Sequence, residues 1–187
     1  MSKAIRNKAK ELLGYGLPKQ VVFDTIVIEH PEAKPKKVAD LLRYMPTQQA
    51  RERFGKPHQA LLGTIALSAA LRVLRSLMEK DIQLDQATAY LSLVPIATVL
   101  VGWSLYRWQG QVFQWVGWGN LFSGTTLLSA LQDLAKGEGD PWVIVLSALS
   151  AGTGALSLYL VHRVFAKPKE EKDPLGGPSR YTFPLEA

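Results

Sequence analysis

The sequence lacks cysteine and has few side chains suited to catalysis. No cysteine occurs among its 187 residues, which excludes disulfides, thiolate metal sites and cysteine nucleophiles. Its three histidines, His30, His58 and His162, lie far apart along the chain. The sequence also contains no Walker loop, nucleophile elbow, HExxH motif or pair of catalytic carboxylates. We therefore expect a protein that is not an enzyme and that holds no metal and no cofactor.

Charge is absent from three long stretches, although charged residues make up 20% of the sequence. The uncharged stretches are residues 86–106, 108–132 and 141–161, which are 21, 25 and 21 residues long. A helix needs about 20 residues to cross the ~30 Å hydrocarbon core of a bilayer. Each stretch is therefore long enough to form one membrane-spanning helix.

A further span is predicted to start at Pro57, although Arg72 and Arg75 lie near its end. Long basic side chains in the last turns of a span can reach the lipid headgroups. The polar positions of this helix fall within an arc of roughly 80°; they are Thr64, Ser68, Arg72, Arg75 and Glu79. We expect this face to turn toward other helices. A helix lying on the membrane surface is the alternative, but its polar face would carry no charge before Arg72.

The sequence thus predicts an all-α membrane protein with four transmembrane helices and a small cytoplasmic N-terminal helical section. We expect the bundle at 57–166, with spans at about 57–77, 86–106, 111–132 and 141–163. Pro95 should kink the second span, and residues 107–110 should form a short hairpin connection. Residues 167–187 are charged and contain proline and glycine, which predicts an irregular cytoplasmic tail.

Residues 1–56 form a basic section with a mostly helical pattern. Helices are expected from a cap at Ser2 to about Leu13, over 18–30 and over 34–44, followed by a short fourth helix. Two apolar faces are predicted: Val22, Phe23, Ile26 and Val27 in the second helix, and Val38, Leu41 and Leu42 in the third. About 55 residues is a marginal size for an independent fold. We therefore expect this section to rest partly on the membrane or on a partner.

Basic residues are distributed unevenly between the two sides of the predicted bundle. The side that holds both termini has 18 Lys and Arg residues, and the opposite side has 4. The positive-inside rule therefore places both termini in the cytoplasm. The first 50 residues are polar and basic, so no cleavable signal peptide is expected. The organisation resembles, in type rather than in motif, that of small bacterial inner-membrane proteins, and we expect a multi-pass protein of the inner (plasma) membrane.

Polar residues within the predicted spans are candidates for a functional path. Arg72 and Arg75 can line an anion path or bind lipid phosphate; the simpler interpretation is snorkelling, with an Arg75–Glu79 pair. Gln114 and Asn120 can line a pore with Ser123 and Thr126. Intramembrane amides more often hydrogen-bond to neighbouring helices. No carboxylate or histidine lies at mid-depth in a predicted span, which argues against a proton-coupled pump.

Small residues recur at four-residue spacing in the fourth predicted span, which favours close helix packing. Ser147, Ala151 and Ala155 share one face, with Ser150 and Gly154 beside them. The expected partner of this face is the first span, where Ala66 and Ala70 are similarly spaced, or the same span of a second copy. Trp103, Trp108 and Trp142 fall near the expected membrane interfaces, as belt anchors do.

Two functional hypotheses follow from these features. The leading one is a non-enzymatic scaffold or accessory subunit that makes helix–helix and cytoplasmic contacts. The alternative is a small oligomeric channel or transporter, lined by the third span and the Arg72/Arg75 stripe. Besides the lipid bilayer, we expect anionic lipid headgroups as partners of the basic N-terminal section, rather than nucleic acid. A homo-oligomer or a larger membrane complex is also expected.

Overall fold

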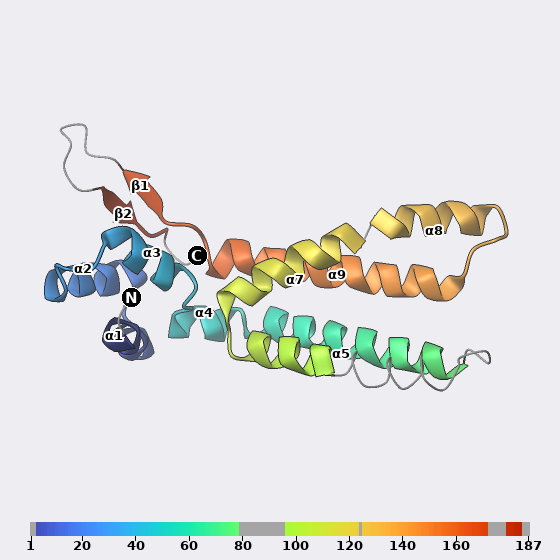
Figure 1. Cartoon of the computed structure of the whole chain (residues 1–187), viewed down its shortest axis with the longest axis horizontal. Helices are drawn as coiled ribbons and strands as arrows, with labels where there is room; N and C mark the ends of the chain where they lie inside the picture. The colour runs from blue at the N-terminus through green and yellow to red at the C-terminus, as the bar shows by residue number, and fades with distance from the viewer. Residues whose placement is uncertain (1–2, 79–95, 124, 172–178, 185–187) are drawn as a thin grey trace. The chain divides into compact units, whose positions relative to one another are not determined.

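The computed structural model describes residues 3–78, 96–123, 125–171 and 179–184, and these residues are mostly helical (Figure 1). The chain divides into two compact units. Unit 1 comprises Met1–Lys56 and Leu160–Ala187, and unit 2 comprises Pro57–Tyr159. The first boundary lies where the sequence pattern changes from basic to apolar. The second boundary lies inside a long helix, so residues 160–166 group with unit 1 rather than with the bundle to which the sequence analysis assigns them.

Unit 1 begins with four helices: α1 (Lys3–Gly14), α2 (Lys19–Glu29), α3 (Pro35–Arg43) and α4 (Gln48–Arg53). Their ends follow local chemistry. Gly16, with φ of +80°, follows α1 in the left-handed conformation that favours glycine, and Pro35 occupies the first turn of α3. The Thr47 hydroxyl accepts a 3.2 Å hydrogen bond from the Ala50 amide and caps α4. The predicted cap at Ser2 lies outside the described residues.

The core of unit 1 is apolar and is formed by three of these helices. The residues that sequence periodicity assigns to the apolar face of α2 include Val22, Phe23 and Ile26, and all three are buried. Val38 and Leu42 of α3 are fully buried as well. The helical faces predicted for α2 and α3 are therefore confirmed.

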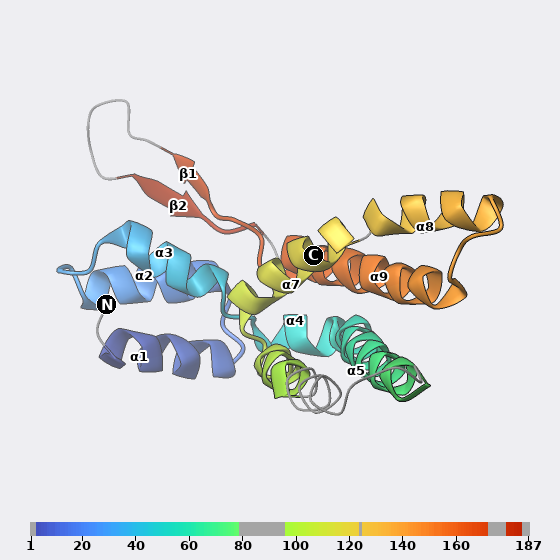
Figure 2. The same ribbon diagram turned by 45° about the vertical axis from the view of Figure 1, so that its right-hand side comes forward.

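The C-terminal tail is ordered in part, so the prediction of an irregular tail is wrong. Strands β1 (Lys169–Glu171) and β2 (Arg180–Thr182) pair antiparallel, with Glu170 opposite Tyr181. Figure 2 shows this hairpin beside α3, and β2 contacts that helix. Strands of three residues are too short to produce a recognisable alternation, and their exposed positions are charged or polar. The sequence pattern therefore resembled a solvated tail.

The hairpin completes the core of unit 1. The rings of Tyr181 and Phe183 lie 6.0 and 5.8 Å from the ring of Phe23, and both residues belong to the same buried cluster as α1, α2 and α3. The Tyr181 hydroxyl donates a 3.0 Å hydrogen bond to the Glu170 carboxylate. Burial raises the pKa of Tyr181, and the neighbouring Glu170 carboxylate raises it further. The two ends of the chain thus share one core.

The last long helix, α9 (Pro141–Val164), ends within unit 1. Two basic side chains bind the carbonyl groups at its end: Lys19 Nζ donates to Val164 O at 3.0 Å, and Arg43 Nε donates to Phe165 O at 3.3 Å. Lys19 is only 5% exposed. Cations at a helix C-terminus satisfy free carbonyls and complement the helix dipole. These contacts attach the end of α9 to α2 and α3.

Unit 2 contains most of α5 (Gly55–Met78), the helical residues Ile96–Tyr106, α7 (Gly110–Ser123), α8 (Thr125–Ala135) and most of α9. In both views the 96–106 helix lies beside α5, and α8 lies beside α9. Helix α5 covers the first predicted span. The second predicted span is described only from Ile96 onward, so the predicted kink at Pro95 lies outside the described residues.

The third predicted span, 111–132, is not one continuous helix. It is divided into α7 and α8, with residue 124 outside the described residues. The Thr125 hydroxyl donates a 2.7 Å hydrogen bond to Phe122 O, and so satisfies a carbonyl at the end of α7. The absence of charge predicted the length of this segment but could not reveal its division.

Within the described part of the chain, one helix is long and apolar enough to cross a membrane, and that helix is α9. Its 24 residues correspond to about 36 Å of helix. The 96–106 helix is apolar but shorter. The structure therefore supports one membrane-span candidate, and the other three spans remain predictions.

The shared core predicts that the tail stabilises unit 1. Replacing Phe183 with alanine should lower the free energy of local unfolding of unit 1 by about 3–5 kcal/mol, because a buried ring is lost from the core. Hydrogen exchange of the α2 amides in the full chain measures this change. Thr182→Ala, at an exposed position of the same strand, is the matched control. Equal protection of α2 in both variants would show that the tail does not contribute to this core.

Candidate functional site

Burial in unit 2 differs from that in unit 1: Leu61, Leu105 and Phe113 are buried, but so are several polar side chains. Its buried residues include the polar side chains of His58, Ser147, Ser150, Thr153 and Ser157. Large apolar side chains lie on its surface instead, and Trp115 and Phe122 are 80% and 71% exposed. Exposed large apolar residues occur on each of the helices that the structure describes in this unit; examples are Leu67, Val99, Leu100, Leu121, Leu128 and Val145. This distribution is unfavourable in water and suits an apolar solvent.

Three buried serines of α9 and the buried Gly154 form a row that we call the α9 seam: Ser147, Ser150, Gly154 and Ser157. Their spacing of three and four residues places them on one helical face. Ser157 Oγ donates to Phe113 O at 2.6 Å, and Ser150 Oγ donates to Asn120 Oδ1 at 2.8 Å. Ser147 and Thr126 hydroxyls lie 3.0 Å apart. The α9 seam therefore contacts α7 and α8 along several turns.

Gly154 is the point of closest approach between α9 and α7. A Cβ atom at this position would lie 2.7 Å from Leu121 N and 3.0 Å from Gly117 O, both of which are backbone atoms. On α7, a Cβ atom at Gly117 would lie 2.7 Å from Leu158 Cδ2. Only glycine permits this approach, as expected for small residues at membrane-helix interfaces.

The predicted contact of the small-residue face with Ala66 and Ala70 is not found, and its contact with the same span of a second copy stays a prediction. Ser147, Ser150 and Gly154 pack against α7 and α8, not against Ala66 and Ala70 of the first span. Of the two alanines predicted to share the face, Ala151 is half-buried and Ala155 is exposed. Residue spacing identifies a face that permits close packing, but it carries no information about which helix occupies that face.

The amide of Asn120 is used in helix packing. Its Nδ2 donates to Val116 O at 2.9 Å, and its Oδ1 accepts from Ser150. Gln114 is half-buried and also has an interaction partner. The side chain of Ser123 lies outside the described residues. The geometry of Asn120 thus favours the helix-bonding interpretation over the pore interpretation.

Two residues of the polar face predicted for α5, Thr64 and Arg75, contact α9 or the residue that precedes it. Thr153 Oγ1 donates to Thr64 Oγ1 at 3.2 Å, and Arg75 Nη2 lies 2.9 Å from Asp140 Oδ2. Asp140 also accepts a 2.9 Å hydrogen bond from the Trp142 amide at the start of α9. The sequence analysis predicted Glu79 as the partner of Arg75, and Glu79 lies outside the described residues. Arg72 is exposed.

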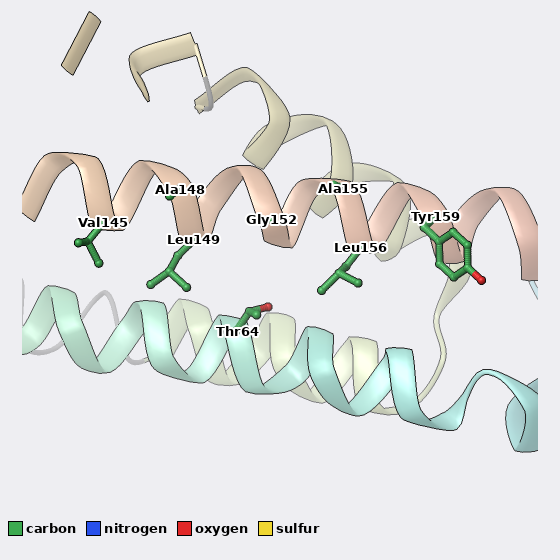
Figure 3. Close-up of a pocket in the computed structure, with 8 residues that line it drawn as sticks. All are labelled: Thr64, Val145, Ala148, Leu149, Gly152, Ala155, Leu156 and Tyr159. Carbon is green, nitrogen blue, oxygen red and sulfur yellow. The ribbon is translucent and has the colours of Figure 1, made fainter. Parts of the chain in front are cut away.

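An open groove of about 730 Å³ lies between α5 and α9 (Figure 3). Its lining is mostly apolar and consists of Thr64, Val145, Ala148, Leu149, Gly152, Ala155, Leu156 and Tyr159. Figure 3 shows the side chains of Leu149 and Leu156 pointing toward α5. Nothing lies within 4 Å of a Cβ atom built at Gly152. Such a lining suits hydrocarbon rather than a hydrated ion.

The structure gives His58 a position that the sequence did not indicate. Its Nε2 lies 2.9 Å from Leu105 O, and its ring stacks on Trp108 with 4.1 Å between centroids. Phe113 lies on the same cluster, at 5.9 Å from the His58 ring. His58 therefore links the start of α5 to the turn before α7. No sequence signal could have identified this contact, because 47 residues separate His58 from Leu105.

The polar groups of the site form hydrogen bonds between helices, and the surface of the unit around them is largely apolar. Within the described ranges, no group of three or more His, Asp or Glu side chains is arranged to hold a metal ion. Comparisons with protein-family models, curated proteins and solved structures find no match for this chain. The interpretation of its function therefore depends on its own residues.

Two glycines on α9 provide a matched test of the close approach. Gly154→Ala should lower the melting temperature of the purified chain in detergent, because the new Cβ atom would overlap the α7 backbone. Gly152→Ala should leave the temperature unchanged or raise it, because alanine favours helix by about 1 kcal/mol and its position is open. The same gain in helix propensity applies to both variants, so their difference reports packing. Identical melting curves would contradict the contact between α9 and α7.

Proposed function

We propose that this protein is an integral inner-membrane scaffold or accessory subunit with four membrane-spanning segments. The observation that carries the proposal is the burial pattern of unit 2, where hydroxyl groups of α9 are buried, the Asn120 amide is half-buried and many large apolar side chains are exposed. Lipid tails solvate apolar side chains, while polar side chains between helices can bond to one another. Unit 1, with its apolar core, is the part in water.

Unit 1 contains both ends of the chain, and this supports an even number of membrane crossings. Residues 1–56 and 160–187 form one unit with one core, which supports the proposal that both ends of the chain lie on the same side of the membrane. A chain that leaves one side at Pro57 and returns to it at Leu160 crosses an even number of times. Because α9 is one crossing, at least one other segment must cross as well.

The described helices suit four crossings. Helix α5 has 24 residues, or about 36 Å, which exceeds the ~30 Å of a hydrocarbon core. Helices α7 and α8 have 14 and 11 residues and together follow α9 from Phe113 to Thr126. They act as one bent span. The uncharged stretch 86–106, which ends in the Ile96–Tyr106 helix, completes the set.

Charge assigns the side on which unit 1 lies. The predicted side of the termini carries 18 of the 22 Lys and Arg residues, which favours the cytoplasm. Basic side chains near an anionic leaflet contribute about 1 kcal/mol each. Exposed residues such as Arg51, Arg53 and Lys56, next to the start of α5, are suited to this contact. Anionic headgroups are therefore the proposed partners of the N-terminal section.

The interactions of the polar residues favour a scaffold over a channel. Asn120 is bonded to Ser150 and Val116, and Arg75 forms an ion pair with Asp140. The groove between α5 and α9 is apolar. None of these features provides a path for a hydrated ion. We assign contacts with partner subunits, or with further copies of the chain, to the exposed apolar surface of unit 2.

Thiol labelling tests the topology on this cysteine-free background. Cysteines introduced at Ser179 in unit 1 and at Glu138 in the α8–α9 turn should lie on opposite sides of the membrane. An impermeant reagent should label Glu138→Cys in intact cells and should label Ser179→Cys only after the cells are opened. Labelling of Ser179→Cys in intact cells would show that the chain has the opposite orientation in the membrane. Equal labelling of both positions in opened and intact cells would exclude a crossing between them.

Reconstitution tests the scaffold against the channel. Liposomes that contain the purified chain should conduct ions and small solutes no faster than protein-free liposomes. Reproducible flux that is lost in Asn120→Ala or Arg72→Gln, but kept in Gly152→Ala, would establish the channel instead. Purification of the tagged chain in mild detergent should give a complex of fixed stoichiometry larger than one copy. A strictly monomeric chain without a partner would contradict the scaffold.

A further inference from the structure

The turn between the 96–106 helix and α7 carries an exposed basic and aromatic cluster that the proposed scaffold function leaves unexplained. The guanidinium carbon of Arg107 lies 4.7 Å from the centroid of the Trp103 ring. Trp103 in turn stacks on Tyr106, with 6.1 Å between centroids and 25° between ring planes. Trp103 and Tyr106 are 54% and 63% exposed. No acidic side chain among the described residues forms an ion pair with Arg107.

The turn beneath this cluster is held in one conformation. Trp108 has φ of 56°, the left-handed conformation that costs a non-glycine residue about 1–3 kcal/mol. It persists because the Trp108 ring is buried against His58 at 4.1 Å and Phe113 at 6.0 Å. The backbone is fixed further by Trp108 N donating to Leu105 O at 2.8 Å and Gln109 N donating to Ser104 O at 3.1 Å. Arg107, which precedes Trp108, is therefore presented in a defined position.

The chemistry of this cluster suits a phosphate group. An arginine stacked on an indole ring keeps the edge of its guanidinium group free, and that edge matches two phosphate oxygens. The neighbouring indole and phenol rings are amphipathic, as are side chains that lie at the headgroup level of a bilayer. The apolar 96–106 helix ends directly at this turn, where such a level is expected.

We propose that Arg107, Trp103 and Tyr106 form a binding site for the phosphate of an anionic phospholipid. The site rests on the proposed membrane topology, which puts this turn on the cytoplasmic side with the basic ends of the chain. Arg107 binds the phosphate oxygens, the two rings contact the headgroup region, and His58 and Trp108 hold the turn in place. An ordinary belt anchor has no headgroup preference, so selectivity for anionic lipid separates the two roles.

Lipid binding to the full chain in mild detergent tests the site. Native mass spectrometry would compare phosphatidylglycerol with phosphatidylcholine of the same acyl chains. The unchanged chain should retain the anionic lipid more tightly, and Arg107→Gln should weaken that binding about fivefold, which is the equivalent of ~1 kcal/mol for one basic residue at an anionic surface. Arg107→Lys should lose part of the preference, because it keeps the charge but not the planar stacked group. Lys136→Gln, at an exposed lysine of unit 2 in the turn after α8, should keep it.

Several outcomes would overturn the site. Equal loss in Arg107→Gln and Lys136→Gln would show general electrostatic attraction, and an unchanged preference in Arg107→Gln would exclude Arg107. Displacement of the lipid by millimolar inorganic phosphate would identify free phosphate as the ligand. Melting temperatures in phosphatidylcholine should match between the chain and its Arg107 variants, which excludes misfolding as the cause. Release of the chain from membranes by alkaline carbonate would contradict the proposed function itself, whereas a chain that stays in the membrane without lipid preference would contradict only this site.

Discussion

The packing of Tyr181 and Phe183 on Phe23 joins the two ends of the chain in one core, and the proposed organisation depends on this contact. A single core cannot be divided by a bilayer, so in the proposed topology every membrane crossing lies between Lys56 and Leu160 and the crossings are even in number. Lys19 and Arg43 bind the carbonyl groups at the end of α9, so the span candidate is attached to the helices that form this core. Lys19 and Arg43 also place positive charge at the C-terminus of α9, where it complements the helix dipole.

In the proposed organisation unit 1 lies in water and unit 2 lies in lipid, so different interactions stabilise the two units. In water, unit 1 gains free energy by burying apolar side chains. In lipid, apolar side chains gain little from burial, and helices associate through close van der Waals packing and interhelical hydrogen bonds worth about 0.6 kcal/mol each on average. The α9 seam combines both, because Gly154 allows backbone contact with α7 while Ser150 and Ser157 bond on either side. Small residues and hydroxyls are therefore found where unit 1 has Val, Ile and Phe.

Polar residues that suggest a pore when the sequence is considered alone form contacts between helices in the structure. Asn120 and Thr126 are bonded to α9, and Arg75 is bonded to the aspartate that caps α9. Arg107 differs, since it is exposed, stacked on Trp103 and supported by the strained turn at Trp108. A lipid-phosphate site at Arg107 would hold the proposed bundle at a fixed depth in the membrane. Such positioning is what a scaffold requires.

The sequence alone determined the helical segments of unit 1, the change from basic to apolar composition near Pro57 and the asymmetry of charge. These features are local, because helical periodicity places Val22, Phe23 and Ile26 on one face regardless of the partner. The tertiary structure decided what local patterns cannot encode: that α7 and α8 divide one uncharged stretch, that Gly154 faces α7, that Asp140 pairs with Arg75, and that the tail enters the core of unit 1. Each of these outcomes depends on contacts between residues distant in sequence, or on a break in backbone bonding that composition does not reveal. Spacing shows that a face can be packed closely, but the helix that packs there is selected by the free energy of the whole arrangement.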